Sequence, residues 1–434
     1  MIPISWRAIY AEMPPAVGHY LIGTITIGLT LDGGIYTVLL NLYLLRLDYG
    51  PEFIGLLNSV GMAIFAGLSL PIGSIKRYSS RQLLLFGLVL LLIGMVALPL
   101  AQWGPSSIEA HWLIISRTVS YIGLAFFFVH SPPLIVKITR GDQSGVWRGR
   151  TFSWQVATLA LAGFVGGILG GVLPGMFASY LGQTLDDPAP YQYPLLFAAI
   201  IVLPSIIAIW RIDDYPASEH RTSQQSESSS PPPITVIHKL GGLVMLLLVV
   251  RFLQMSGVGA VMTFMNVYLD DGLGVSTSLI GIITAVGRLA GIPVALLVPA
   301  LMLRWSNYRL LIISLVLLVI TIIPMALVPT WQVAGLAYVL LGSVSSVRYL
   351  AFLTFTMSLV REERQAIMSG TGEMAIGLSF AFISFLGGYL IVWFDYSTLF
   401  LTAATISLAG TVLFWWAFHP GRNNAVKARL SQQN

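Results

Sequence analysis

The feature that most restricts this sequence is a succession of long apolar runs separated by short polar breaks. Twelve such runs can be read along the 434 residues, and each is close to the length of about twenty residues that a helix needs to cross a bilayer. Hydrophobic residues make up 56% of the chain and charged residues 9%, a balance that a soluble domain of this size does not tolerate. We therefore expect an all-α membrane protein with twelve transmembrane helices. The expected spans are 17–46, 53–75, 81–103, 109–138, 149–181, 191–211, 238–269, 277–303, 307–328, 331–360, 364–393 and 396–418.

Short patterns in the first half of the chain return in the second half in the same order. Each pair is separated by nearly the same number of residues, which indicates a duplicated unit of about half the chain. The matching segments are Asn41–Tyr43 with Asn266–Tyr268, Ile54–Gly61 with Ile280–Gly287, and Pro71, Lys76 and Arg81 with Pro299, Arg304 and Arg309. We predict two pseudo-symmetric six-helix bundles, residues 1–211 and 237–434, in a layout that secondary transporters use.

A polar segment at residues 212–236 separates the two predicted bundles. It is rich in serine, glutamine and proline, and it has too few apolar residues to pack. We expect it to be a flexible cytoplasmic tether.

The distribution of lysine and arginine predicts the orientation of the chain. The side that holds both termini and the tether carries eighteen of the 23 basic residues, whereas the loops on the other side carry only Arg46. Basic residues concentrate in the cytoplasmic loops of membrane proteins. We therefore expect a multi-pass protein of the cell's inner (plasma) membrane with both termini in the cytoplasm.

Composition and motifs also exclude several classes of function. The chain has no cysteine, which rules out disulfides, thiolate metal sites and thiol nucleophiles. No metal-ligand cluster, nucleophile motif or phosphate-binding loop is present, so we expect neither an enzyme nor a bound metal or cofactor. The net charge of +5 follows from the basic loops and does not indicate nucleic-acid binding. One chain is enough to build this fold, so we expect a monomer.

Six charged residues fall inside the expected spans and away from their ends. A charge at the centre of a bilayer costs about 3 kcal/mol or more on insertion scales, so these positions require an explanation. They are Asp32, Arg117, Arg251, Arg288, Arg348 and Glu373. The first and fourth helix of each half contributes one of them, and equivalent helices of a six-helix repeat face each other near the midplane. We therefore expect a central polar cavity.

The signs of these charges suggest what the cavity binds. If Asp32 offsets Arg117 and Glu373 offsets one arginine of the second half, two arginines still lack a partner, and an unpaired buried charge is costly. An anionic or zwitterionic solute would supply the missing charge to Arg251 and Arg348, because guanidinium groups suit carboxylate and phosphate. Arg288 and Gln254 are further candidates for substrate binding.

The loop between the second and third spans carries a resemblance to a known family. Gly73 and Arg81 match its pattern, whereas Arg77 stands at the position of an acid and Ser80 at that of a glycine. The whole chain resembles the major facilitator superfamily, and the resemblance implies a transporter in which this loop helps to lock a gate. We expect Glu362 and Glu363 to replace the missing acid. The candidate gate residues are Gly73, Lys76, Arg77, Arg81, Arg304, Arg309, Glu362 and Glu363.

The fourth span is similar to the arginine motif of the same family. Leu113, Arg117 and Gly123 fit its spacing. The resemblance implies that Arg117 takes part in proton coupling together with an acid on the first helix, which here is Asp32. Other candidates for proton coupling are Glu373 and His130.

The fifth span carries a glycine pattern that resembles the antiporter motif of this family, with its proline displaced. Glycines at helical spacing allow close helix packing, and the resemblance favours export. The residues are Gly163, Gly166, Gly167, Gly170, Gly171 and Pro174.

Simpler structural interpretations remain open for many of these residues. The glycines can serve packing alone, and the basic loop residues can serve topology alone. His130 can be a satisfied polar residue, and Glu373 can form a structural ion pair with Arg348 or Arg288.

We expect a secondary transporter that moves an anionic or zwitterionic organic solute by alternating access, coupled to protons, with export as the direction that the glycine pattern favours. Two alternatives stay open. One is an exporter or flippase of amphipathic drugs or lipids. The other is a non-transporting assembly factor or receptor on the same scaffold.

Overall fold

A computed structural model describes residues 13–75, 77–139, 146–213, 234–359 and 362–419, and all structural statements below concern these residues. The helices of the first half are α2 (Pro15–Thr30), α3 (Ile35–Arg46), α4 (Pro51–Gly73), α5 (Ser80–Ala97), η1 (Pro99–Trp103), α6 (Ser106–Ile138), α7 (Val146–Leu181), α8 (Ala189–Ile201) and α9 (Leu203–Trp210). Those of the second half are α10 (Ile234–Val267), η3 (Tyr268–Gly272), α11 (Thr277–Arg304), α12 (Asn307–Leu327), α13 (Trp331–Leu359), α14 (Glu362–Trp393) and α15 (Tyr396–Phe418). Together they form twelve segments that are long and apolar enough to cross a membrane, which confirms the predicted fold class.

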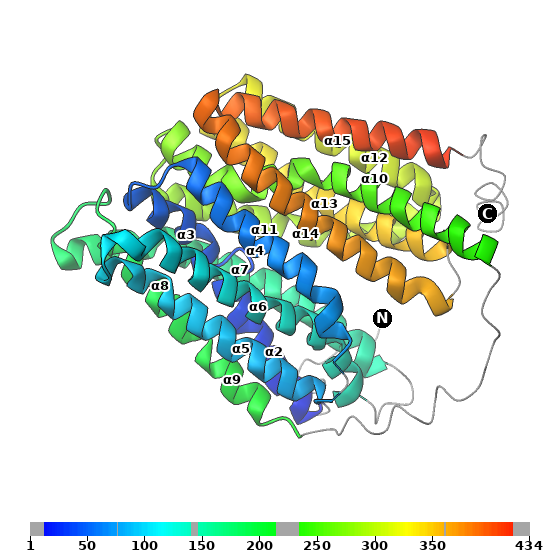
Figure 1. The fold of residues 1–434 in the computed structure, drawn as a ribbon, viewed down its shortest axis with the longest axis horizontal. Coiled ribbons are helices and arrows are strands. Elements are labelled where there is room, and N and C mark those ends of the chain that lie inside the picture. The colour runs from blue at the N-terminus through cyan, green and yellow to red at the C-terminus, as the bar shows by residue number, and fades with distance from the viewer. Residues whose placement is uncertain (1–12, 76, 140–145, 214–233, 360–361, 420–434) are drawn as a thin grey trace, which may run out of the picture.

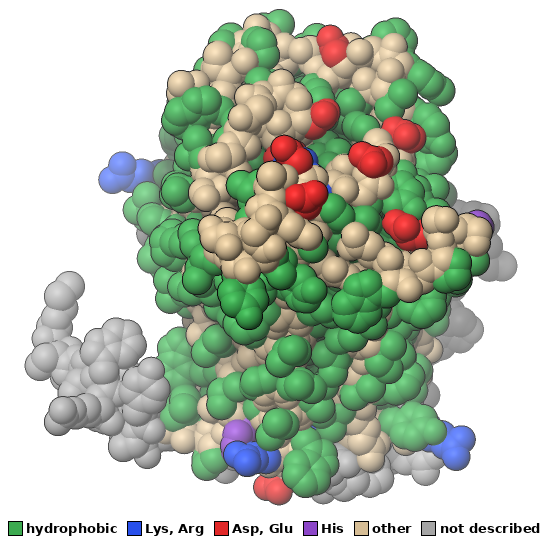
Figure 2. All heavy atoms as spheres, turned by 90° about the vertical axis from the view of Figure 1, so that its left-hand side faces the viewer, with side chains coloured by type: hydrophobic (Ala, Val, Ile, Leu, Met, Phe, Trp, Pro, Cys, Tyr) green, Lys and Arg blue, Asp and Glu red, His purple; other side chains and the backbone are tan. Residues whose placement is uncertain are grey.

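The helices run back and forth, so that their connections lie on two opposite faces (Figure 1). We call the face at which α9 ends and α10 begins the tether face. The face at which α3 ends at Arg46 and α14 ends at Trp393 is the loop face. Figure 2 shows that aspartate and glutamate side chains gather on the loop face. Residues 214–233, most of the predicted tether, lie outside the described residues, so its flexibility stays a prediction.

The first span is not the single helix that was expected over residues 17–46. It is broken between α2 and α3, at Leu31–Gly34. Gly33 has a φ of +81°, a backbone conformation that is open to glycine and strained for most other residues. The break places the peptide groups around Asp32 outside a regular helix, near the middle of the span Pro15–Arg46.

The repeated Tyr43 and Tyr268 make the same contact in the two halves. The hydroxyl of Tyr43 donates to the carbonyl of Pro99 at 3.2 Å, and that of Tyr268 donates to the carbonyl of Met325 at 3.1 Å. Both acceptors lie at the end of the third helix of their half. The duplication therefore extends from the sequence to the buried hydrogen bonds.

The repeated asparagines hold the two halves together. The amide of Asn41 donates to the carbonyl of Thr263 at 2.8 Å, and the amide of Asn266 donates to the carbonyl of Thr37 at 3.2 Å. Each half thus gives a donor and an acceptor to the other, and we call this pair of contacts the asparagine clasp. It lies between the middle of the spans and the loop face.

The glycines of α7 face two neighbours. An added Cβ at Gly163 would lie 2.2 Å from the carbonyl oxygen of Asp32, and one at Gly166 would lie 2.1 Å from that of Leu29. Only glycine at these two positions lets α7 pack closely against the break of the first span. Gly171 packs against Gly281 of α11, where an added Cβ would lie 3.0 Å from the Cα of Gly281. Gly167 packs against the same helix, and Gly170 contacts α3. Pro174 lies within α7, which continues through it.

Candidate functional site

An ion pair between the halves lies at the break of the first span. The guanidinium of Arg288, on α11, pairs with the carboxylate of Asp32, and its Nε also donates to the backbone carbonyl of Asp32 at 3.0 Å. Gly33 makes room for this arginine, because an added Cβ there would lie 2.6 Å from Arg288 Cγ. The pair therefore depends on the local break as well as on the two charges.

This pair is not fully enclosed, although it lies at the middle of both spans. The side chains of Arg288 and Asp32 are 30% and 37% exposed. On the tether-face side of Asp32, α2 packs on α7 and α9 of its own half, and it leaves Ile22 and Ile25 exposed. A partly exposed ion pair and two exposed apolar side chains thus lie on the same span.

Asp32 was expected to offset Arg117, and the structure corrects this pairing. Arg117 instead donates to the side-chain oxygen of Asn58 at 2.9 Å and to the hydroxyl of Tyr121 at 3.2 Å, and it lies over the Tyr121 ring. Asn58 in turn donates to Asn41 at 3.1 Å. Arg117 is therefore linked by neutral groups to the asparagine clasp, and Asp32 takes its partner from the opposite half.

The second half holds a cluster of buried polar groups, which we call the arginine cluster: Arg251, Gln254 and Arg348. Arg251 is 2% and Arg348 3% exposed. The guanidinium of Arg251 lies 4.0 Å from the centre of the Phe352 ring, and Arg348 contacts the sulfur of Met255 at 2.9 Å. These neighbours are aromatic or polarisable, and neither is an anion.

Several nitrogen and oxygen atoms of the arginine cluster have no hydrogen-bond partner among the described residues. They are Nε and Nη1 of Arg251, both amide atoms of Gln254, and Nε of Arg348. A buried donor without a partner costs about 1–3 kcal/mol, and more when it is charged. The arrangement is therefore incomplete without an anion or a polar ligand.

Glu373 lies on α14, one turn before Gly377, and Gly377 packs against Ala66 of α4 in the first half. The residue is exposed. No hydrogen bond or ion pair joins Glu373 to Arg251 in the described structure. A structural ion pair of Glu373 with Arg348 or Arg288 was one open interpretation. For Arg288 it is wrong, because the partner of Arg288 is Asp32.

His130 is 5% exposed and stacks on Phe126 within α6. Its Nε2 has no hydrogen-bond partner among the described residues. No acidic side chain is placed beside it by any described hydrogen bond or ion pair. A role in proton transfer stays a prediction.

The predicted gate residues that the structure describes lie at the tether face. Arg81 donates to the backbone carbonyls of Ile209 and Trp210, so it ties α5 to α9 within the first half. Arg77 lies over Tyr78 at 5.8 Å. Gly73 ends α4, while Arg304 and Arg309 flank the turn between α11 and α12. Lys76 and the side chains of Glu362 and Glu363 lie outside the described residues, so the proposed contact between Arg77 or Arg81 and these acids stays a prediction.

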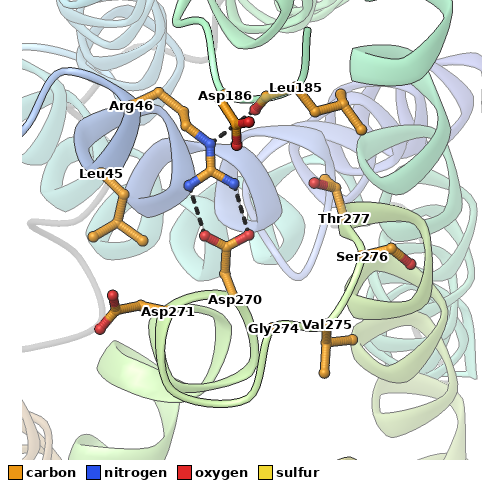
Figure 3. A pocket seen from close by; sticks show the side chains of 10 residues that line it. All are labelled: Leu45, Arg46, Leu185, Asp186, Asp270, Asp271, Gly274, Val275, Ser276 and Thr277. Atoms are coloured by element: carbon orange, nitrogen blue, oxygen red, sulfur yellow. Dashed lines mark hydrogen bonds and ion pairs between the residues drawn. The ribbon is translucent and has the colours of Figure 1, made fainter.

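A second ion pair joins the halves at the loop face, in a pocket of about 420 Å³ (Figure 3). Arg46, at the end of α3, donates to both carboxylate oxygens of Asp270 in η3, at 2.7 and 2.9 Å. Its Nε donates to the carbonyl of Leu185 at 2.8 Å. Arg46 thus connects α3, η3 and the loop that contains Leu185 at the loop face, where the two halves meet. Within the described ranges, no group of three or more acidic or histidine side chains is arranged to hold a metal ion.

The sequence interpretation did not assign several residues that the structure brings together. Arg46 was noted only as the single basic residue on its side, and that isolation was itself a signal of a specific role. Asn41 and Asn266 were recognised as equivalents, but their contacts across the halves were not expected. Asp270 and Phe352 carried no signal that distinguished them from other loop acids and core aromatic residues.

Comparison with known proteins agrees with this architecture. The chain is similar to the crystal structure of the nucleoside transporter NupG (TM-score 0.72, 13% identity, 94% of this chain and 100% of that chain). It is also similar to a D-xylose-proton symporter (0.66, 15%, 94% and 97%) and to a bacterial homologue of the iron transporter ferroportin in an inward-facing state (0.69, 15%, 92% and 97%). At these identities, the likeness concerns the fold. A comparison with curated proteins found no matching sequence.

A family model described as the Major Facilitator Superfamily matches residues 22–372, which is most of the chain. The match begins within α2 and ends within α14. It therefore includes the break at Asp32 and the arginine cluster, as well as the glycines of α7. The chain belongs to the Major Facilitator Superfamily and is a membrane transporter rather than an enzyme.

Proposed function

We propose that this protein is a secondary active transporter that moves an anionic or zwitterionic organic solute by alternating access. The observation that carries this proposal is the arginine cluster, in which Arg251 and Arg348 are buried without a carboxylate partner in the described structure. The cost of such a charge falls when an anion enters. An anionic group of the solute is the partner that fits.

The chemistry of the cluster favours carboxylate or phosphate. A guanidinium offers forked N–H donors that match two oxygens of such a group. Gln254 adds a donor and an acceptor that are both unused among the described residues. Phe352 and Met255 line the same place, so an apolar portion of the solute has surfaces to contact.

Proton coupling is proposed for Asp32 and Glu373, with Arg117 as a linked group. Both carboxylates are accessible, and both lie where the two halves approach each other. Protonation of Asp32 would weaken its hold on Arg288, and protonation of Glu373 would remove a negative charge from the region where α14 approaches α4. Either event changes the charge of the site without moving the solute.

The described contacts favour a state that is closed at the loop face. The asparagine clasp, the Arg46–Asp270 pair and the Gly171–Gly281 contact all lie between the midplane and that face. We infer that the site opens toward the tether face, which the distribution of basic residues predicts to be the cytoplasmic face. The glycine pattern of α7 favours export as the direction of transport.

A second candidate is an exporter or flippase of amphipathic compounds. The exposed Ile22 and Ile25, on the same span as the partly exposed Asp32, favour it, because a polar head group and an apolar tail would both find a surface. Efflux of a lipophilic dye from cells, with and without the protein, separates this candidate from a carrier of small anions.

The test is flux into proteoliposomes that contain the purified protein. We expect uptake of at least one organic anion or zwitterion from a broad panel, and a loss of at least about tenfold in Arg251→Gln or Arg348→Gln, in line with a lost charge-assisted hydrogen bond. Arg211→Gln, at the exposed end of α9, is the matched control. Undiminished transport of every substrate by the Arg251→Gln variant would overturn the proposal.

A further inference from the structure

We infer that the Asp32–Arg288 pair is the first binding site for the solute and that it selects a zwitterion. The carboxylate of the solute takes the guanidinium of Arg288, and its ammonium group takes the carboxylate of Asp32. This inference rests on the proposed function and names the substrate class more narrowly. The solute replaces an internal ion pair with two external ones.

The place of the pair suits a transported solute. Asp32 belongs to the first half and Arg288 to the second, and both lie near the middle of their spans. A ligand that bridges them contacts both halves at once. Alternating access requires such a ligand, because a solute bound by one half alone does not bias the arrangement of the two.

The exposure of the pair makes exchange inexpensive. At 30% and 37% exposure, the ion pair is not fully enclosed, and a partly exposed pair is held less strongly than a buried one. Opening it therefore costs less than opening an enclosed pair. Arg251 and Arg348 are only 2% and 3% exposed, so a solute that arrives from water meets Arg288 before it meets them.

Charge balance separates a zwitterion from a simple anion at this site. The Asp32–Arg288 pair is neutral as a unit. An anion bound to Arg288 would leave the carboxylate of Asp32 beside it, and the two negative groups would repel each other. A zwitterion satisfies both side chains and keeps the unit neutral.

The backbone around the pair adds to this selectivity. Asp32 precedes Gly34, the N-cap of α3, and this helix start has no side-chain cap. The amides at a helix N-terminus carry partial positive charge and favour a carboxylate. The backbone carbonyl of Asp32, at the same break, accepts a hydrogen bond from Arg288. The break therefore offers a hydrogen-bond acceptor as well as the amide donors. Positive and negative groups therefore lie side by side, as the two ends of a zwitterion require.

The experiment measures binding to the full purified protein by thermal shift and calorimetric titration. The probes are ω-amino acids from glycine to 6-aminohexanoate, each matched with the carboxylic acid that lacks the amine. We expect at least one ω-amino acid to raise the melting temperature, and to bind at least about tenfold more tightly than its matched acid. Asp32→Asn should remove this tenfold preference. Asp48→Asn, in an exposed turn of the loop face, is the matched control and should keep it.

A second variant distinguishes loss of binding from loss of folding. The double variant Asp32→Asn with Arg288→Gln removes both charges together and keeps the site neutral, so it should fold and should bind neither end of the zwitterion. Zwitterion binding that survives in this variant would overturn the inference, as would the absence of binding by every ω-amino acid. If simple anions bind, and do so only with Arg251 intact, the proposed function stands and this inference fails. If neither class binds or is transported, both fail.

Discussion

Arg288 and Arg251 are both arginines inside the membrane-spanning part of the second half, yet their surroundings differ. Arg288 is 30% exposed and pairs with Asp32 of the other half. Arg251 is 2% exposed, lies against Phe352 and has two guanidinium nitrogens without a partner among the described residues. One arginine is joined to an acid at an accessible junction, and the other is enclosed within its own bundle.

The difference separates two uses of buried positive charge. A partly solvated pair contributes little energy and can open easily, so Arg288 is suited to exchange partners. An enclosed charge without a partner costs stability, and such a cost is retained in a protein when function depends on it. The comparison therefore predicts opposite responses when the two arginines are replaced.

The largest expected effect comes from replacing each arginine with methionine. Arg251→Met removes an enclosed charge, so it should raise the free energy of unfolding by about 1–4 kcal/mol while lowering transport at least tenfold. Arg288→Met should leave the stability within about 1 kcal/mol and also lower transport. Melting temperature in detergent and flux in proteoliposomes measure both. The comparison breaks if Arg251→Met destabilises the protein more than Arg288→Met does.

A second effect concerns the helix contact that positions Arg288. Gly281 lies two turns before it on α11, and an added Cβ there would lie 2.6 Å from the backbone of Gly167 on α7. Gly281→Leu should therefore destabilise the protein by about 1–3 kcal/mol and separate Arg288 from Asp32. The measurements are the melting temperature and transport.

Gly175→Leu is the matched control for this variant, because an added Cβ at Gly175 meets nothing within 4 Å. Leucine also favours the helix more than glycine does. A similar loss in both variants would mean that the approach of α7 to α11 is not the cause.

A third effect tests the other ion pair between the halves. Asp270→Asn weakens the bidentate contact with Arg46, so it should increase opening at the loop face. The protein contains no cysteine, so Thr284→Cys, at a position that is 2% exposed, introduces a single thiol. Labelling of this thiol by an impermeant maleimide should become about tenfold faster, which corresponds to about 1.4 kcal/mol. Asp187→Asn, in the same face, should leave the labelling rate unchanged.

The smallest effect concerns Asp395, an exposed carboxylate at the start of α15 that accepts a hydrogen bond from a backbone amide. Asp395 caps α15 by accepting from the backbone N–H of Thr398 at 2.6 Å, and this hydrogen bond lowers the pKa of Asp395. A lowered pKa contributes stability above the ordinary value of about 3.9, and this contribution is lost as the pH falls below that value. Asp395→Ala should cost about 1 kcal/mol or less near neutral pH. Asp395→Asn should keep the cap and remove its pH dependence, and melting curves between pH 3 and 7 check both.

The sequence predicted the spans well because membrane crossing depends on the length and hydropathy of each run, which are local properties. The duplication was predictable for a similar reason, since equivalent residues such as Tyr43 and Tyr268 stand in the same order. The break at Leu31–Gly34 was not predicted, because two glycines in an apolar run do not by themselves show where a helix stops.

The partners of the charged residues were less predictable. Asp32 was linked to Arg117 because the family resemblance implies an acid on the first helix that works with this arginine, whereas the structure pairs Asp32 with Arg288. Such a partner depends on which helices of the two halves meet and at what depth, and the sequence does not contain this information directly. Among the described residues, no carboxylate pairs with Arg251 or Arg348. This agrees with the excess of arginines over acids inside the predicted spans, and the use of these two arginines in transport stays a prediction.

The asparagine clasp has a consequence for the origin of the fold. Asn41 donates to the backbone carbonyl of Thr263, and Asn266 donates to those of Thr37 and Val38; Val38 precedes Asn41 by three residues, as Thr263 precedes Asn266. A half-length chain with one such asparagine would already carry both the donor and, three residues before it, the backbone acceptor needed to bind a second copy of itself. This arrangement fits a homodimeric ancestor that closed at its loop face before gene fusion joined the two copies.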